Sequence, residues 1–125
     1  MRRLIVAIPL ALVLCSCART NQRHIGTWRS IVPGMGELTW AIGDKTIEMA
    51  ATNPDEKESG QYTIDYARTP IELDITLPGK TIRCIMEFID KDSFKVVGEK
   101  DPNEPRPGSF EPERDVILFT RIPQP

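Results

Sequence analysis

Cysteine and histidine, the side chains that most often act as nucleophiles, proton carriers and metal ligands, are rare in this chain of 125 residues. There are 3 cysteines and a single histidine, His24. A catalytic Cys84 needs a base nearby, and His24 falls in a polar segment that we interpret as solvated. Cys84 also stands on the apolar side of an alternating segment, so we interpret it as a small buried hydrophobic residue. With so few of these side chains we expect no zinc or iron site, no metal and no cofactor.

Acidic side chains are plentiful, and two of them in the mouth of a cavity are able to act as acid and base in hydrolysis. Glu72, Asp74 and Glu87, however, alternate with apolar neighbours, which is typical of a solvated outer face. The chain also lacks a glycine-rich phosphate loop and a Gly-x-Ser-x-Gly nucleophile motif. We therefore expect no catalytic residues and no enzyme, and hydrolysis by paired carboxylates is the least favoured of the functions considered.

Residues 100–113 hold 4 of the 11 prolines, so this segment is predicted as a long loop rather than a helix or a central strand. Within it, Arg106, Pro107 and Phe110 belong to the run Arg-Pro-Gly-Ser-Phe. A loop stiffened by proline that offers an arginine and a phenylalanine is a candidate recognition loop or lid. The alternative, which we favour, is that Phe110 plugs one end of the fold while Arg106 pairs with a carboxylate at a strand end.

The N-terminus has the composition of an export signal. Arg2 and Arg3 give it a basic start, and the apolar run over residues 4–14 is shorter than the roughly 20 residues of a membrane-spanning helix. At its end, Leu14-Cys15-Ser16-Cys17 resembles the lipobox of bacterial lipoproteins. The resemblance implies cleavage between Ser16 and Cys17 and transfer of a diacylglyceryl group to the thiol of Cys17. We expect a cell-envelope protein that its acyl chains anchor to a membrane.

Processing at this site changes the cysteine and charge balance. The mature chain keeps only Cys84 as a free thiol, so it has no partner for an intramolecular disulfide. Loss of Arg2 and Arg3 leaves 14 basic against 18 acidic residues, a net charge near −4, which argues against nucleic acid as a partner. The expected partners are the membrane, a small apolar ligand or another envelope protein. Ala18, which is not acidic, favours the outer membrane under the sorting pattern of Gram-negative bacteria.

Beyond the polar tether, short segments alternate apolar and polar residues between turn residues, which predicts strands. A central ribbon over residues 69–88 turns at Pro78-Gly79, and a charged loop is predicted over residues 52–59. The other predicted strands cover residues 26–32, 37–42, 45–51, 60–67, 93–99 and 115–122. About eight strands joined by tight turns predict an all-β fold, a small antiparallel up-and-down barrel. A two-sheet sandwich is the alternative, but it needs longer connections.

The predicted organisation is therefore a signal peptide over residues 1–16, a tether over 17–25 and a barrel domain over 26–122. From Gly26 to Arg121 the chain resembles a family of small exported bacterial domains, described mainly from planctomycetes, to which no function is assigned. The matching segments are Gly26-Thr27-Trp28 and residues 60–65, 69–74, 84–88, 106–110 and 120–121. The two ends are also similar to those of lipocalin-like barrels, which implies that Trp28 on the first strand packs against Arg121 near the last.

These observations lead to one favoured function and one alternative. The favoured function is a lipid-anchored, lipocalin-like binding module for a small apolar ligand or an envelope partner. The alternative is a structural or protein-interaction barrel whose interior is filled by side chains and holds no ligand cavity. The size of the interior cavity distinguishes the two.

Overall fold

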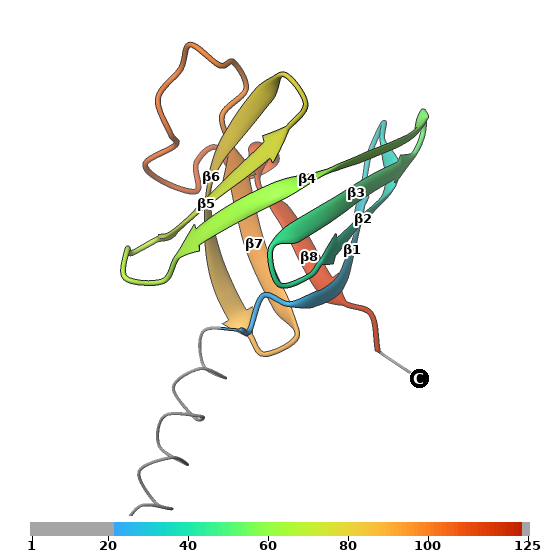
Figure 1. Ribbon diagram of the computed structural model, residues 1–125, viewed down its shortest axis with the longest axis horizontal. Helices are drawn as coiled ribbons and strands as arrows, with labels where there is room; N and C mark the ends of the chain where they lie inside the picture. Colours follow the sequence, from blue (N-terminus) through green and yellow to red (C-terminus); the bar gives the residue numbers. More distant parts are fainter. Residues whose placement is uncertain (1–21, 124–125) are drawn as a thin grey trace, which may run out of the picture.

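The computed structural model describes residues 22–123, which form a closed antiparallel β-barrel (Figure 1). Its eight strands follow one another around the barrel in chain order, so the topology is up-and-down. The strands are β1 (Gly26–Val32), β2 (Gly36–Ile42), β3 (Thr46–Thr52), β4 (Asp55–Asp65), β5 (Ile71–Leu77), β6 (Lys80–Asp90), β7 (Ser93–Gly98) and β8 (Ile117–Arg121). The all-β barrel predicted from the alternating pattern is confirmed.

Because successive strands run in opposite directions, the barrel has two distinct ends, which we call the closed end and the mouth. The closed end carries residues 22–25 and the turns that follow β2, β4 and β6. The mouth carries the turns that follow β1, β3 and β5, together with loop 99–116 between β7 and β8. In Figure 1 the mouth is uppermost, and the long orange loop stands beside it.

Aromatic side chains fill the middle of the barrel and the half toward the closed end. Trp28, Phe94 and Phe119 are each fully buried. The ring centroids of Trp28 and Phe94 are 4.6 Å apart, and those of Phe94 and Phe119 are 5.3 Å apart. Separations of this size are favourable for aromatic pairs and add to the burial of their area. The rings form a rigid base on which the mouth is built.

The structure corrects the prediction of a charged loop over residues 52–59. β3 and β4 are joined by a turn of only Asn53 and Pro54, and Asp55 already pairs with Thr52. The first five residues of β4, from Asp55 to Ser59, are all exposed. Backbone pairing with β3 therefore makes this segment a strand, although it has no apolar face to bury. The hairpin extends the wall of the barrel beyond the core at the mouth.

Loop 99–116 covers part of the outer surface of the barrel. Ile85 and Val97 are paired across β6 and β7 on the outward face, yet they are only 2% and 6% exposed. The loop crosses this region, since Arg106 of the loop donates a hydrogen bond to the carbonyl of Cys84, next to Ile85. Helical structure within residues 22–123 is limited to the 3₁₀ turn Glu113–Asp115, and no helix there is long and apolar enough to cross a membrane.

Candidate functional site

The mouth of the barrel contains two adjoining apolar cavities of about 250 and 260 Å³. Both are lined by Trp40, Met49, Ile82 and Ile117, which come from β2, β3, β6 and β8. These side chains point inward because they occupy the same alternate positions as the buried residues of their strands. Met49, Ile82 and Ile117 are only partly buried against the core. The core therefore leaves the upper part of the barrel interior unfilled.

One wall of the mouth combines a buried thiol with charged rim residues. Cys84 is 3% exposed, and burial raises the pKa of its thiol to about 12, so the group stays protonated and unreactive. The interpretation of Cys84 as a small buried hydrophobic residue is thus confirmed. At the rim above it, Arg83 contacts Glu99 at 2.7 Å and Lys100 contacts Asp115 at 2.9 Å. The hydrogen bond from Arg83 holds the pKa of Glu99 below its usual range. The surface presented to a ligand is apolar inside and ionic at the rim.

Trp28 and Arg121 meet at the closed end, as the sequence predicts. They are paired in register between β1 and β8, and the guanidinium carbon of Arg121 lies 4.2 Å from the centre of the indole ring. Such a cation–π contact is worth about 0.5–2 kcal/mol. Gly26 is required beside them, because a Cβ at this position would lie 2.5 Å from the guanidinium and its φ of 143° is rarely adopted by other residues.

Arg121 also ties the chain ends together. Its guanidinium donates hydrogen bonds to the carbonyls of Ile25, Arg23 and Lys91, and it contacts Asp92 at 3.2 Å. A planar group with five N–H donors suits this task better than an ammonium group. Residues 22–25 are therefore held against the closed end.

His24 corrects the interpretation of this histidine as solvated. It is 5% exposed, and its ring nitrogens lie 2.8 Å from the hydroxyl of Tyr66 and 2.9 Å from that of Tyr62. Tyr62 donates its own proton to the carbonyl of Gly43, so Nε2 of His24 donates to Tyr62 and Nδ1 accepts from Tyr66. Sequence reasoning missed this cluster because the partners are 38 and 42 positions away. The one signal in the sequence was that Tyr62 and Tyr66 lie on the same inward-facing side of their segment, where their hydroxyl groups need partners.

We expect the stability of the barrel to decrease as the pH falls below about 6.5, because burial lowers the pKa of His24 from 6.5. A lowered pKa means that the unfolded chain binds the proton more readily. The contribution of neutral His24 is therefore complete above pH 6.5, and it is lost as the pH falls toward the lower pKa of the folded state. Urea unfolding between pH 7.5 and 5.5 measures this slope.

A matched variant isolates this effect. His24 is the only histidine in the sequence, so His24→Gln removes the group that titrates in this range and flattens the slope, whatever its own effect on stability. An equal slope in the parent and the variant contradicts a role for His24.

The candidate recognition loop lies on the outside of the barrel. Arg106 contacts Asp74 at 2.6 Å and Glu72 at 3.6 Å, both on β5, and donates to the carbonyl of Cys84. These carboxylates point outward, as predicted, but they lie within the strand rather than at its end. Arg106 is thus used to hold the loop to the wall.

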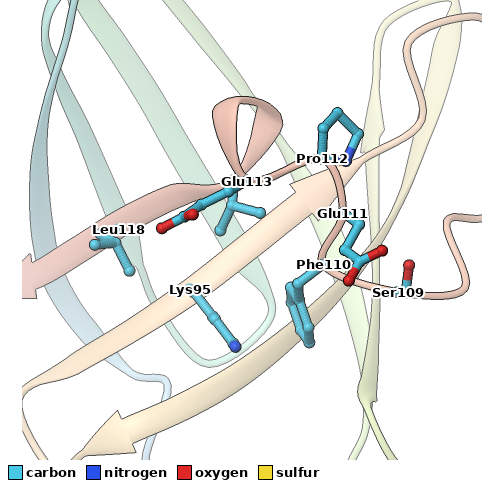
Figure 2. A pocket seen from close by; sticks show the side chains of 8 residues that line it. Lys95, Ser109, Phe110, Glu111, Pro112, Glu113 and Leu118 are labelled. Carbon is cyan, nitrogen blue, oxygen red and sulfur yellow. The ribbon is translucent and has the colours of Figure 1, made fainter.

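Phe110 does not plug an end of the barrel, which corrects the interpretation favoured from the sequence. Its ring lies on the outer face of β7, 4.4 Å from the ammonium nitrogen of Lys95. Figure 2 shows the two side chains together with Leu118 around a surface pocket of about 1000 Å³. Pro107, half-buried, belongs to the same segment but does not line this pocket. The proline-rich loop packs along the outer wall instead of closing the mouth.

The remaining predicted positions fall outside this geometry. Ser16 and Cys17, with the predicted cleavage and acylation, lie outside the described residues. Within residues 22–123, no group of three or more histidine, cysteine or acidic side chains is placed to hold a metal ion.

Comparison with known proteins yields no relative. No family model matches the chain, and no curated protein and no solved structure matches it. The resemblances to the planctomycete domain, to bacterial lipoproteins and to lipocalin-like barrels therefore stay predictions. The function has to be inferred from the geometry of the site.

Proposed function

We propose that this protein is a lipid-anchored module of the cell envelope that binds a small apolar ligand in the mouth of its barrel. The observation that carries the proposal is the pair of adjoining cavities lined by Trp40, Met49, Ile82 and Ile117. Ligand sites are typically concave, mainly apolar and placed in the mouths of barrels. Because aromatic rings fill the barrel below, the ligand would lie in the upper part and not traverse it.

The chemistry of the mouth suits an apolar group with a polar head. The inner wall offers indole, thioether and aliphatic surface. The rim adds charges of both signs, since Lys57, Lys80 and Glu58 lie at one side and Lys100 with Asp115 at the other. An alkyl chain fits the wall, and its head group reaches the rim. Of the acids that line the mouth, Glu99 and Asp115 are engaged by basic partners, which favours binding over hydrolysis by that pair.

The proposed anchor orients the mouth. Residues 22–25 are fixed at the closed end, and the five residue-to-residue steps from Cys17 to Gln22 span at most about 18 Å. An acylated Cys17 therefore keeps the closed end near the membrane, and the mouth faces away from it. A ligand then reaches the mouth from the aqueous side or from a partner.

Ala51→Leu tests the site, because Ala51 faces inward on β3 and lines the mouth. We expect bromodecanol to quench the fluorescence of Trp40 with a saturable dependence in a chain that begins at residue 22, once its cooperative unfolding is verified. The added side chain occupies the cavity and should weaken binding about tenfold, which corresponds to about 1.4 kcal/mol. Titration of tryptophan fluorescence measures the change.

Ala41→Leu is the control, since Ala41 lies on the neighbouring strand β2 and alternates with the inward residues Trp40 and Ile42. It should leave the affinity unchanged. Quenching that never saturates, or equal affinities in both variants, contradicts a ligand site in the mouth. That result favours the alternative function, a barrel that acts through protein contacts on its surface.

A further inference from the structure

The pairing between β1 and β8, which closes the barrel, is incomplete. These strands are in register only at Trp28 with Arg121 and at Arg29 with Thr120. Every other neighbouring pair of strands shares four or more such positions. β1 continues for three residues past the last pair, to Val32, and β8 begins three residues before it, at Ile117. We call these facing segments, residues 30–32 and 117–119, the seam. In Figure 1 β1 diverges from β8 toward the mouth.

A groove of about 500 Å³ lies along the seam. Two of its lining side chains are unusually exposed for their type, Ile31 at 77% and Leu118 at 57%. Val32, Pro33 and Val116 extend the apolar surface around them. Large apolar side chains that gather on a surface mark a site of interaction.

The backbone of the seam supplies a second requirement for docking. Past Arg29, β1 is paired with β2 on one side only, so its other edge offers peptide groups to an incoming strand. An extended peptide that adds to such an edge gains main-chain hydrogen bonds, and its alternate side chains reach the flanking surface. Here that flanking surface carries Ile31 and Leu118.

The charges of the groove indicate the composition of the strand. Arg29 and Arg114 line it, and no acidic residue does, although the whole chain has a net charge of −2. Neither arginine forms a salt bridge with another residue in the described part of the chain. A second copy of the chain would bring like charges together if it docked by the same groove. An acidic strand is therefore the complementary occupant.

We propose that the seam between β1 and β8 binds an extended peptide segment of a partner protein whose outward face carries both apolar and acidic residues, because Arg29 and Ile31 lie on the same face of β1. The segment adds as a strand to the free edge of β1, covers Ile31 and Leu118 with its apolar residues and pairs its acidic residues with Arg29 and Arg114. The seam adjoins the ligand site and shares Ile117 with it, but Ile31 and Leu118 lie on the outward face, whereas the ligand site is bounded by the inward-facing residues of the mouth.

The test uses the full chain purified in detergent and two capped octapeptides labelled with a fluorophore. In one, glutamate and valine take turns at every second position with serine between them, so that both lie on one face of the strand, and in the other lysine replaces glutamate. We expect the glutamate peptide to bind at least tenfold more tightly by fluorescence anisotropy and to lose affinity as salt is added. Amide hydrogen exchange should slow at residues 30–32 when it binds. Equal affinities, or protection elsewhere, overturn the proposal.

Variants with a reversed charge sharpen the result, because both arginines are exposed and their replacement leaves the core intact. Arg29→Glu and Arg114→Glu should each weaken the glutamate peptide about tenfold and improve binding of the lysine peptide. Arg68→Glu, an exposed arginine on the turn after β4, is the control and should change neither affinity. Ala51→Leu should also change neither affinity, which separates the seam from the mouth. A chain that dimerises through residues 30–32 without peptide overturns the proposal in favour of self-association.

Discussion

Replacing Trp28 with alanine is expected to lower the free energy of unfolding of the barrel by about 3–5 kcal/mol. The side chain is fully buried, lies 4.6 Å from Phe94 between ring centroids and carries the guanidinium of Arg121 on its face. Its Nε1 also donates a hydrogen bond to the carbonyl of His24. The substitution removes the packing and leaves that carbonyl without its donor. Urea unfolding followed by circular dichroism measures the loss.

Ile31→Ala is the matched control for stability, because Ile31 lies on the same strand but is 77% exposed. It should change the free energy of unfolding by no more than about 0.5 kcal/mol. Trp28→Phe should fall between the two, since a phenyl ring keeps part of the packing but not the hydrogen bond. If Trp28→Ala unfolds at the same urea concentration as Ile31→Ala, then Trp28 is not the residue that closes this end.

The strands could be predicted from local patterns, and the pairing of Trp28 with Arg121 from the resemblance of the two ends to those of lipocalin-like barrels. An apolar residue at every second position identifies the inward face of a strand, and turn residues mark where it ends. The pattern therefore predicts β1 with the bounds that it has, Gly26–Val32. In an up-and-down barrel the first and last strands must meet, so residues near the two ends of the domain become neighbours. This topology explains why the pair that the resemblance names, Trp28 and Arg121, is in contact.

The first half of β4 could not be predicted from side chains. Residues 55–59 have no apolar face, and only their pairing with β3 makes them a strand. Hydrogen bonds between main chains satisfy the same polar groups whatever the side chains are. Such a segment can be recognised as a strand only when the position of its partner strand is known.

The functional geometry was the least predictable part, because it depends on contacts between distant residues. Arg106 pairs with Asp74 on β5, and His24 with tyrosines of β4 and the turn after it. Neither pair has a spacing that a pattern can detect. The cavity in the mouth is even harder to predict from the sequence. The sequence predicts that Met49 and Ile82 face inward, but the space they leave depends on how the strands are tilted and on the volumes opposite them.

Cys17→Ala is expected to have the largest effect on the processing of the protein and to remove its lipid anchor. The thiol of Cys17 is the predicted attachment point of the diacylglyceryl group, and the following cleavage depends on that modification. One acyl chain gives only marginal membrane binding, whereas two or three anchor a protein stably, so loss of all of them removes the anchor. We expect an uncut precursor or a misdirected product in place of the acylated mature chain. Membrane fractionation and the intact mass of the mature protein measure both outcomes.

Cys15→Ala is the control, because Cys15 belongs to the signal peptide and leaves with it under the proposed processing. This variant should yield the same acylated mature mass as the parent and should stay with membranes. The two substitutions are chemically identical and lie two positions apart, so a difference between them can only come from the role of Cys17. If the Cys17→Ala protein is still processed to the parent's mature mass and still sediments with membranes, the lipoprotein assignment is wrong. Ordinary signal cleavage, or attachment at Cys15, would then account for the N-terminus, and the mouth of the barrel would lose its fixed orientation.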